Sequence, residues 1–153
     1  MFDTRILMLI LCAVIAYLIG SISFSYLFSK EIKHEDITKK GSGNAGTTNM
    51  LRNYGWKLGI LTLLCDLLKA VGSALIGYFI AGDYGMYIAS VFVIVGHVWS
   101  CYLKFKGGKG IAATTGVLLV MNPLPTIIIF AVCVLIVVKT KIMSIGSIIG
   151  LIA

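Results

Sequence analysis

Hydrophobic residues in this chain form long continuous blocks instead of alternating with polar ones. The blocks at residues 6–28, 58–81, 84–103 and 125–138 meet or approach the roughly 20 apolar residues that a membrane-spanning helix needs. Two shorter apolar runs occupy residues 111–121 and 142–153. Only helices and closed barrels satisfy their backbone polar groups within lipid, and blocks of this length are typical of helices. The pattern therefore predicts an all-α, polytopic integral membrane helix bundle.

Composition agrees with this class of protein. Hydrophobic residues make up 59% of the 153 residues, charged residues only 12%, and the mean hydropathy is +1.01. The first block is longer than the apolar core of a secretory signal, so we expect a retained helix. The cysteines lie in or beside apolar runs, where they behave as small hydrophobic residues. We expect one transmembrane domain over residues 1–153.

Positive charge is concentrated between particular blocks. If the first helix starts outside, residues 29–57, 104–110 and 139–141 fall on one side and carry nearly all the cations, whereas the other side offers only Arg5. This asymmetry predicts that the basic loops face the cytoplasm. The orientation of the protein in the membrane and its attraction to anionic lipid headgroups account for much of the net charge of +7. They do not account for the glycines in those loops.

Two basic loops are rich in glycine and in small hydroxyl residues. "KKGSGNAGTTNMLR" spans residues 39–52 and "LKFKGGKGIAATTG" spans residues 103–116, each leading into a helical run. Glycine allows close backbone approach or positive φ, and successive N–H groups in such turns bind anions. Ser42 and Asn44 are candidate N-caps of the first helix. We predict two phosphate sites at helix N-termini on one face. The alternative is that these loops are interfacial caps that water and lipid headgroups satisfy.

Nucleotide-binding motifs do not fit either loop. Residues 41–46 read G-x-G-x-x-G, but lysines and a transmembrane block precede them where the dinucleotide fingerprint requires a strand. In the second loop Gly110 follows Gly108 and Lys109, where a Walker loop has Ser or Thr. Nucleotide hydrolysis is therefore not indicated.

Three ionisable residues lie within the apolar blocks. Asp66 and Lys69 are three residues apart and hence on one helical face, either as a pair that fixes the bundle or as functional groups. His97 lies near the cytoplasmic end of its block. It could accept a proton, donate to a phosphate or form an interhelical hydrogen bond.

Two stretches carry a family resemblance. "GSGNAGTTNMLR" and "GHVWSCYLKFKGGKGIAATTG" resemble the first two signature motifs of the bacterial acyl-phosphate:glycerol-3-phosphate acyltransferases, the PlsY family, and the likeness extends over essentially the whole chain. The resemblance implies transfer of a fatty acyl group from acyl phosphate to the 1-hydroxyl of glycerol 3-phosphate, forming lysophosphatidic acid and phosphate in phospholipid synthesis. It also implies about six to seven helices in the full family fold.

The resemblance further implies roles for residues of both motifs. The catalytic candidates are Ser42, Arg52, His97 and Lys104. The substrate-binding candidates are Gly41, Gly43, Asn44, Gly46, Asn49, Lys106, Gly107, Gly108, Lys109 and Gly110. Direct attack on the activated acyl group is expected, with His97 or a substrate phosphate oxygen taking the proton. No cofactor, metal or nucleic acid is expected. The expected partners are acyl phosphate, glycerol 3-phosphate and membrane lipids, at the cytoplasmic face of the bacterial inner membrane.

The other acyltransferase class, which uses a histidine with an aspartate five positions later, does not fit. Lys39 and Tyr102 stand at that distance after His34 and His97. The PlsY resemblance also implies a third motif containing His, Asn and Glu on the following part of the chain, and residues 1–153 contain none. We therefore expect the domain to be C-terminally incomplete relative to the family. The alternatives are a small-anion transporter or channel, and a non-catalytic membrane subunit.

Overall fold

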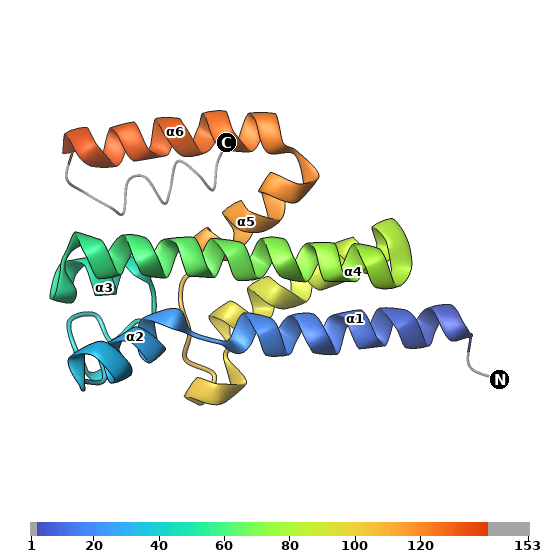
Figure 1. Ribbon diagram of the computed structural model, residues 1–153, viewed down its shortest axis with the longest axis horizontal. Helices are drawn as coiled ribbons and strands as arrows, with labels where there is room; N and C mark the ends of the chain where they lie inside the picture. Colours follow the sequence, from blue (N-terminus) through green and yellow to red (C-terminus); the bar gives the residue numbers. More distant parts are fainter. Residues whose placement is uncertain (1–2, 141–153) are drawn as a thin grey trace.

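The computed structural model describes residues 3–140, and all regular secondary structure within them is helical. Figure 1 shows the order of these helices along the chain. They are α1 (Thr4–Ser21), α2 (Phe24–Lys33), the 3₁₀ turn η1 (Ile37–Lys39), α3 (Thr47–Tyr54), α4 (Trp56–Val98), the 3₁₀ turn η2 (Cys101–Leu103), α5 (Ile111–Met121) and α6 (Pro123–Thr140). The predicted all-helical class is confirmed. The apolar run at residues 142–153 lies outside the described residues.

The element α4 contains two helices that fold back on each other. Ala81 and Gly82 leave the helical conformation, with Gly82 at φ +62°, and the chain reverses there (Figure 1). The separate blocks predicted at 58–81 and 84–103 are thus confirmed, although the second helix ends at Val98. The two limbs pack tightly, because a Cβ added to Gly77 would lie 2.4 Å from the carbonyl oxygen of Gly85.

Small residues bring the other helices equally close. A Cβ on Gly20 of α1 would lie 2.2 Å from the carbonyl oxygen of Val93 in the second limb of α4. A Cβ on Gly116 of α5 would lie 2.4 Å from the carbonyl oxygen of Leu67 in the first limb. Because lipid is as apolar as leucine, close packing between small residues is a main source of stability in membrane bundles. The glycines therefore fix how α1 and α5 contact α4.

The prediction of one continuous helix over residues 6–28 was wrong. α1 ends at Ser21, and α2 starts at Phe24 with the Ser23 hydroxyl accepting the N–H of Tyr26 at 3.3 Å. Such a break frees backbone groups that need partners within the bundle. Ser100 Oγ donates to the carbonyl of Ser21 at 2.6 Å, and Lys69 Nζ donates to the carbonyl of Ile22. The break is thus satisfied by side chains from distant sequence, which hydropathy alone does not reveal.

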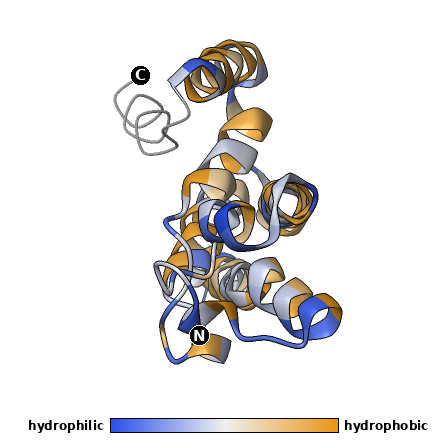
Figure 2. Ribbon diagram, turned by 90° about the vertical axis from the view of Figure 1, so that its left-hand side faces the viewer, coloured by the Kyte–Doolittle hydropathy of each residue, from blue (hydrophilic) through white to orange (hydrophobic). Residues whose placement is uncertain are grey.

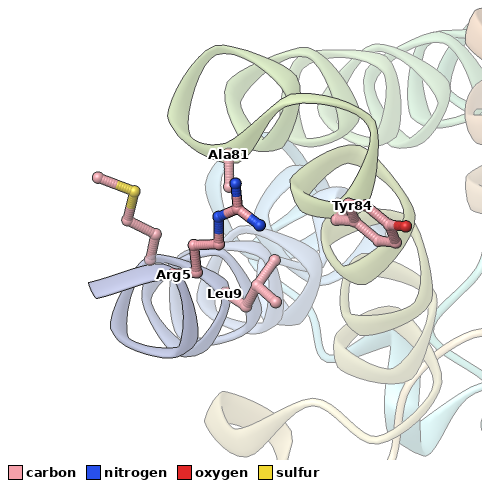
Figure 3. A pocket seen from close by; sticks show the side chains of 5 residues that line it. Arg5, Leu9, Ala81 and Tyr84 are labelled. Carbon is pink, nitrogen blue, oxygen red and sulfur yellow. The ribbon is translucent and has the colours of Figure 1, made fainter. Parts of the chain in front are cut away.

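The bundle has a polar end and a less polar end. α2, η1 and α3 lie toward the left in Figure 1, and Figure 2, seen from that side, shows hydrophilic residues on the short helices and loops. Two stretches, Thr4–Lys33 and Trp56–Leu103, are long and apolar enough to cross a membrane. At the opposite end a pocket of about 320 Å³ is lined by Arg5, Met8, Leu9, Ala81 and Tyr84 (Figure 3). This pocket is separate from both glycine-rich loops.

Candidate functional site

The first glycine-rich loop is organised by the buried side chain of Asn49 on α3. Its Oδ1 accepts the backbone N–H of Ser42 at 3.1 Å, and its Nδ2 lies within 3.2 Å of the carbonyl oxygens of Ile37, Lys40 and Asn44. One carboxamide therefore connects the start, middle and end of the loop. The resemblance places Asn49 against the substrate, whereas the structure uses its polar atoms to shape the loop.

Glycine is required at two turns of this loop. Gly41 and Gly43 have φ of +55° and +70°, which L side chains rarely adopt. These turns carry the chain on to Gly46, which is the N-cap of α3 and provides no side-chain cap. The prediction that Ser42 or Asn44 caps this helix was therefore wrong, because the helix begins at Thr47, beyond both residues.

Polar groups without protein partners surround the start of α3. Asn44 Oδ1 and Thr47 Oγ1 are buried, and neither has a hydrogen-bonding partner in the described part of the chain. The side chains of Ser42 and Arg52 are exposed, and within residues 3–140 Arg52 forms no ion pair. Buried polar atoms normally find a partner. Asn44 Oδ1 and Thr47 Oγ1 are therefore available to a polar ligand at the N-terminus of α3, whereas Arg52 lies in the last turn of that helix.

The second loop is held against the end of α4. The Gly107 N–H donates to the carbonyl of Val98, and the Gly108 N–H donates to the carbonyl of His97, both at 3.0 Å. Lys104 and Phe105 have φ of +53° and +61°, an uncommon conformation for residues other than glycine. α5 then begins at Ile111, where the sequence predicts the start of a helical run, and Gly110 is its N-cap.

The two loops meet at Gly46 and Gly108. A Cβ on Gly46 would lie 3.6 Å from the Cα of Gly108, and a Cβ on Gly108 would lie 2.1 Å from His97 Nε2. The N-cap of α3, the loop before α5 and the imidazole are therefore neighbours. This juxtaposition agrees with the predicted common polar region at two helix N-termini.

Exposed cations flank this meeting point in sequence. Lys104, Lys106 and Lys109 are all exposed, and none forms an ion pair among residues 3–140. A helix N-terminus attracts anions through its dipole by about 0.3–1 kcal/mol. Backbone N–H groups and unpaired lysines together make an electropositive site suited to phosphate.

Behind the loops lies a buried ionic cluster. Asp66 Oδ1 is 2.8 Å from Lys69 Nζ and 3.5 Å from His97 Nδ1. The three residues are 1%, 9% and 6% exposed, respectively. The predicted pairing of Asp66 with Lys69 is confirmed, and His97 joins them from the other limb of α4.

A second ionic cluster outside the spans holds the approach to the first loop. Glu35 Oε2 lies 2.5 Å from Lys40 Nζ and accepts the Tyr54 hydroxyl at 2.8 Å. The bond from Lys40, then that from Tyr54, lowers the pKa of the Glu35 carboxyl below its usual value. Burial and the Glu35 carboxylate raise the pKa of Tyr54 to about 12, so this hydroxyl remains a donor. The cluster ties the segment before Gly41 to the end of α3.

The structure brings several of the sequence-predicted residues together and adds others. Gly46, Gly107, Gly108 and Gly110 lie where the loops meet or where α5 begins, and Gly41 and Gly43 shape the first loop. Thr47 was not predicted as a site residue, although it lies in the hydroxyl-rich "GTTN" run that could have indicated it. Asp66 and Lys69 were noted as a pair, but their contact with His97 depends on the fold of α4.

The chain is similar to known proteins over most of its length. A family model described as glycerol-3-phosphate acyltransferase matches residues 10–153. The glycerol-3-phosphate acyltransferase of Thermoanaerobacter sp. (strain X514) is 46% identical over 141 residues, covering 92% of this chain and 71% of that protein. The corresponding protein of Clostridioides difficile (strain 630) is 45% identical over 148 residues, covering 93% and 72%.

Solved structures give the same result. The crystal structure of PlsY (YgiH), an integral membrane glycerol 3-phosphate acyltransferase, matches in its glycerol 3-phosphate form with a TM-score of 0.86. It is 33% identical and covers 94% of this chain and 72% of that one. The lysophosphatidic acid form matches with a TM-score of 0.83 and 32% identity.

Fold, site and matches together define an integral membrane acyltransferase with an all-α polytopic bundle. The chain belongs to the glycerol-3-phosphate acyltransferase family. These findings confirm the family resemblance and the expected class of enzyme.

Proposed function

We propose that this protein transfers a fatty acyl group from acyl phosphate to the 1-hydroxyl of glycerol 3-phosphate, releasing lysophosphatidic acid and inorganic phosphate. The observation that carries the proposal is the meeting of two glycine-rich loops at Gly46 and Gly108, beside His97 Nε2. Both substrates carry a phosphate, and each loop leads into a helix N-terminus that favours an anion. A relative crystallised in glycerol 3-phosphate and lysophosphatidic acid forms supports the same assignment.

The proposed reaction needs positioning more than activation. The ester bond forms between the 1-hydroxyl oxygen and the acyl carbon, and the bond from that carbon to the phosphoryl oxygen breaks. The hydroxyl proton passes to His97 or to a substrate phosphate oxygen, and phosphate leaves with the bonding electron pair. Because acyl phosphate is already activated, orientation and stabilisation of oxyanion charge by N–H groups and cations provide most of the acceleration.

Residue roles follow from where the side chains lie. Ser42 and Arg52 are exposed near the start and end of the first motif, so they can hold a phosphate and orient the reacting groups. The loop carrying Lys104, Lys106 and Lys109 would bind glycerol 3-phosphate, with Gly107, Gly108 and Gly110 shaping its backbone. Asn44 Oδ1 can accept a hydrogen bond from a glycerol hydroxyl, and the Thr47 hydroxyl can accept or donate one. We place this site at the cytoplasmic face of the bacterial plasma membrane, because the basic loops lie around it.

Transfer of labelled acyl groups by the purified chain in liposomes tests this proposal. We expect product from acyl phosphate and glycerol 3-phosphate, and loss of it in Ser42→Ala and Arg52→Gln. Lys57→Gln is the matched control, because Lys57 is an exposed cation at the start of α4. Absence of transfer together with phosphate flux into sealed vesicles would instead identify an anion transporter. Absence of both, with no binding of glycerol 3-phosphate, would indicate a non-catalytic subunit.

A further inference from the structure

The pocket at the end of the bundle opposite the glycine-rich loops holds a single charged side chain. Its volume is about 320 Å³, and Arg5, Met8 and Leu9 of α1 line it together with Ala81 and Tyr84 of α4. Figure 3 shows the Arg5 side chain extending from α1 toward Ala81, at the turn between the two limbs of α4. The pocket thus combines a guanidinium with mainly apolar walls.

Helix periodicity explains why this arginine faces the pocket. Cys12, Ala16 and Gly20 form the buried face of α1. Arg5 and Leu9 precede them at the spacing of three or four residues that keeps side chains on one face of a helix. Arg5 therefore continues the face of α1 that packs against the bundle, one step beyond the part that is covered.

The guanidinium of Arg5 has no acidic partner among residues 3–140. Two acids lie near it in the fold, and neither forms an ion pair with it. Asp3 is the N-cap of α1, where its Oδ1 accepts the backbone N–H of Arg5 at 3.1 Å, and Asp83 is exposed at the turn of α4. A planar guanidinium can bind two oxygens of a phosphate at once. The pocket therefore offers a phosphate group an unpaired donor.

Aromatic side chains indicate the depth at which this pocket lies in the membrane. Tyr78, Phe79, Tyr84 and Tyr87 flank the turn of α4, and their side chains are between 48% and 82% exposed. Amphipathic aromatic rings such as tyrosine gather at the level of the lipid headgroups. The pocket thus opens where phospholipid phosphates lie.

We propose that this pocket binds the headgroup of a membrane phospholipid, with Arg5 contacting the phosphate. Met8, Leu9 and Ala81 then contact the glycerol and the first methylenes of the acyl chains. A free phosphate ion would leave these apolar walls in water, whereas a lipid covers them, so the lipid is the better fit. The volume is at the lower end of the range for organic ligands, which suits a headgroup. The site lies far from the glycine-rich loops, so the proposal does not depend on acyl transfer.

A tryptophan placed in the pocket reports which lipid lies beside it, because brominated acyl chains quench tryptophan fluorescence on contact. In a Trp56→Phe/Trp99→Phe background, Tyr84→Trp introduces the sole tryptophan, and both native tryptophans are exposed. In maltoside micelles, we expect dibrominated phosphatidylglycerol to quench it at about 5-fold lower concentration than a dibrominated galactosyl diacylglycerol, which has no phosphate. Arg5→Gln should abolish this preference. Lys57→Gln, which removes a cation at the start of α4, should keep it.

Equal quenching by the two lipids, or a preference that survives Arg5→Gln, would overturn the proposal. Inorganic phosphate, compared with sodium chloride of the same ionic strength, should not relieve the quenching. Relief by inorganic phosphate would show that the pocket takes a free anion, and would overturn the lipid assignment.

Thermal unfolding separates lipid binding from a role of Arg5 in the fold. Because Arg5 forms no ion pair among the described residues, Arg5→Gln should unfold at the wild-type temperature in lipid-free detergent. Added phosphatidylglycerol should raise the unfolding temperature of wild type more than that of Arg5→Gln, because a ligand that binds only the folded state stabilises it. A loss of stability in Arg5→Gln without lipid, or equal stabilisation of both proteins by the lipid, would contradict the proposal.

Discussion

The carboxamide oxygen of Asn49 accepts the backbone N–H of Ser42 at 3.1 Å, and this bond joins α3 to the turn between Gly41 and Gly43. The same side chain also binds backbone carbonyls at three other points of the loop. The orientation of Ser42 therefore depends on a residue seven positions away, whose own side chain is buried.

Replacing Asn49 by Ala should disorder the first loop. Several backbone groups would lose their partner, and each unsatisfied buried group costs about 1–3 kcal/mol. We expect lower thermal stability and a higher KM for glycerol 3-phosphate. The matched control is Asn53→Ala, because Asn53 only donates to the Asn49 carbonyl and side chain from an exposed position. Equal effects of the two variants on KM would contradict a specific role for Asn49.

Much of this architecture follows from the sequence. The apolar blocks predicted the helices and the turn near Gly82, and the glycine and cation pattern predicted which loops meet. The break at Ile22 was not predictable from hydropathy, because Lys69 and Ser100, which satisfy the freed carbonyls there, come from distant parts of the sequence. The N-cap at Gly46 was also missed, because the positive-φ turns at Gly41 and Gly43 continue the loop past Ser42 and Asn44 before the helix begins.

Substituting Gly108 by Ala tests the contact between the second loop and His97. The new Cβ would lie 2.1 Å from His97 Nε2, so either the imidazole or the loop must move. A misplacement of about 1 Å at a reacting group can cost about 100-fold in rate. We expect a loss of acyl transfer of that order in steady-state assays.

The control for this substitution is Gly72→Ala. Gly72 lies within α4, and an added Cβ there has no neighbour within 4 Å among the described atoms. Because alanine favours helix over glycine by about 1 kcal/mol, stability should stay constant or rise and activity should be unchanged. Full activity in Gly108→Ala would show that the loop does not need to approach His97 this closely.

The ionic cluster around Glu35 should make loop stability depend on pH. The pKa of Glu35 is lowered in the folded state, so its stabilisation is present above its ordinary pKa of 4.5 and is lost as pH falls through the lowered value. Glu35→Gln should therefore lower the unfolding temperature at neutral pH, and the difference from wild type should be smaller at about pH 3, below the ordinary pKa of the carboxyl. Tyr54→Phe, which removes the hydroxyl donor, should act in the same direction. Thermal unfolding in detergent at both pH values measures this. A difference that persists unchanged in acid would mean that the Glu35 charge is not what stabilises the loop.

The lysines of the second loop should contribute to substrate affinity mainly through charge. Lys106→Gln and Lys109→Gln each remove an exposed cation beside Gly107 and Gly108. An exposed charge pair contributes about 1 kcal/mol or less, so each KM for glycerol 3-phosphate should rise by a factor of about 5 at most. Salt screens such interactions, with a Debye length of about 8 Å at physiological ionic strength. The wild-type KM should therefore rise with salt, and the double variant should respond less.

Lys57→Gln, which removes a cation from another position on the same face, should leave both KM and its salt dependence near wild type. If it changes them as much as the loop variants do, the attraction comes from the whole basic face and not from a site at this loop.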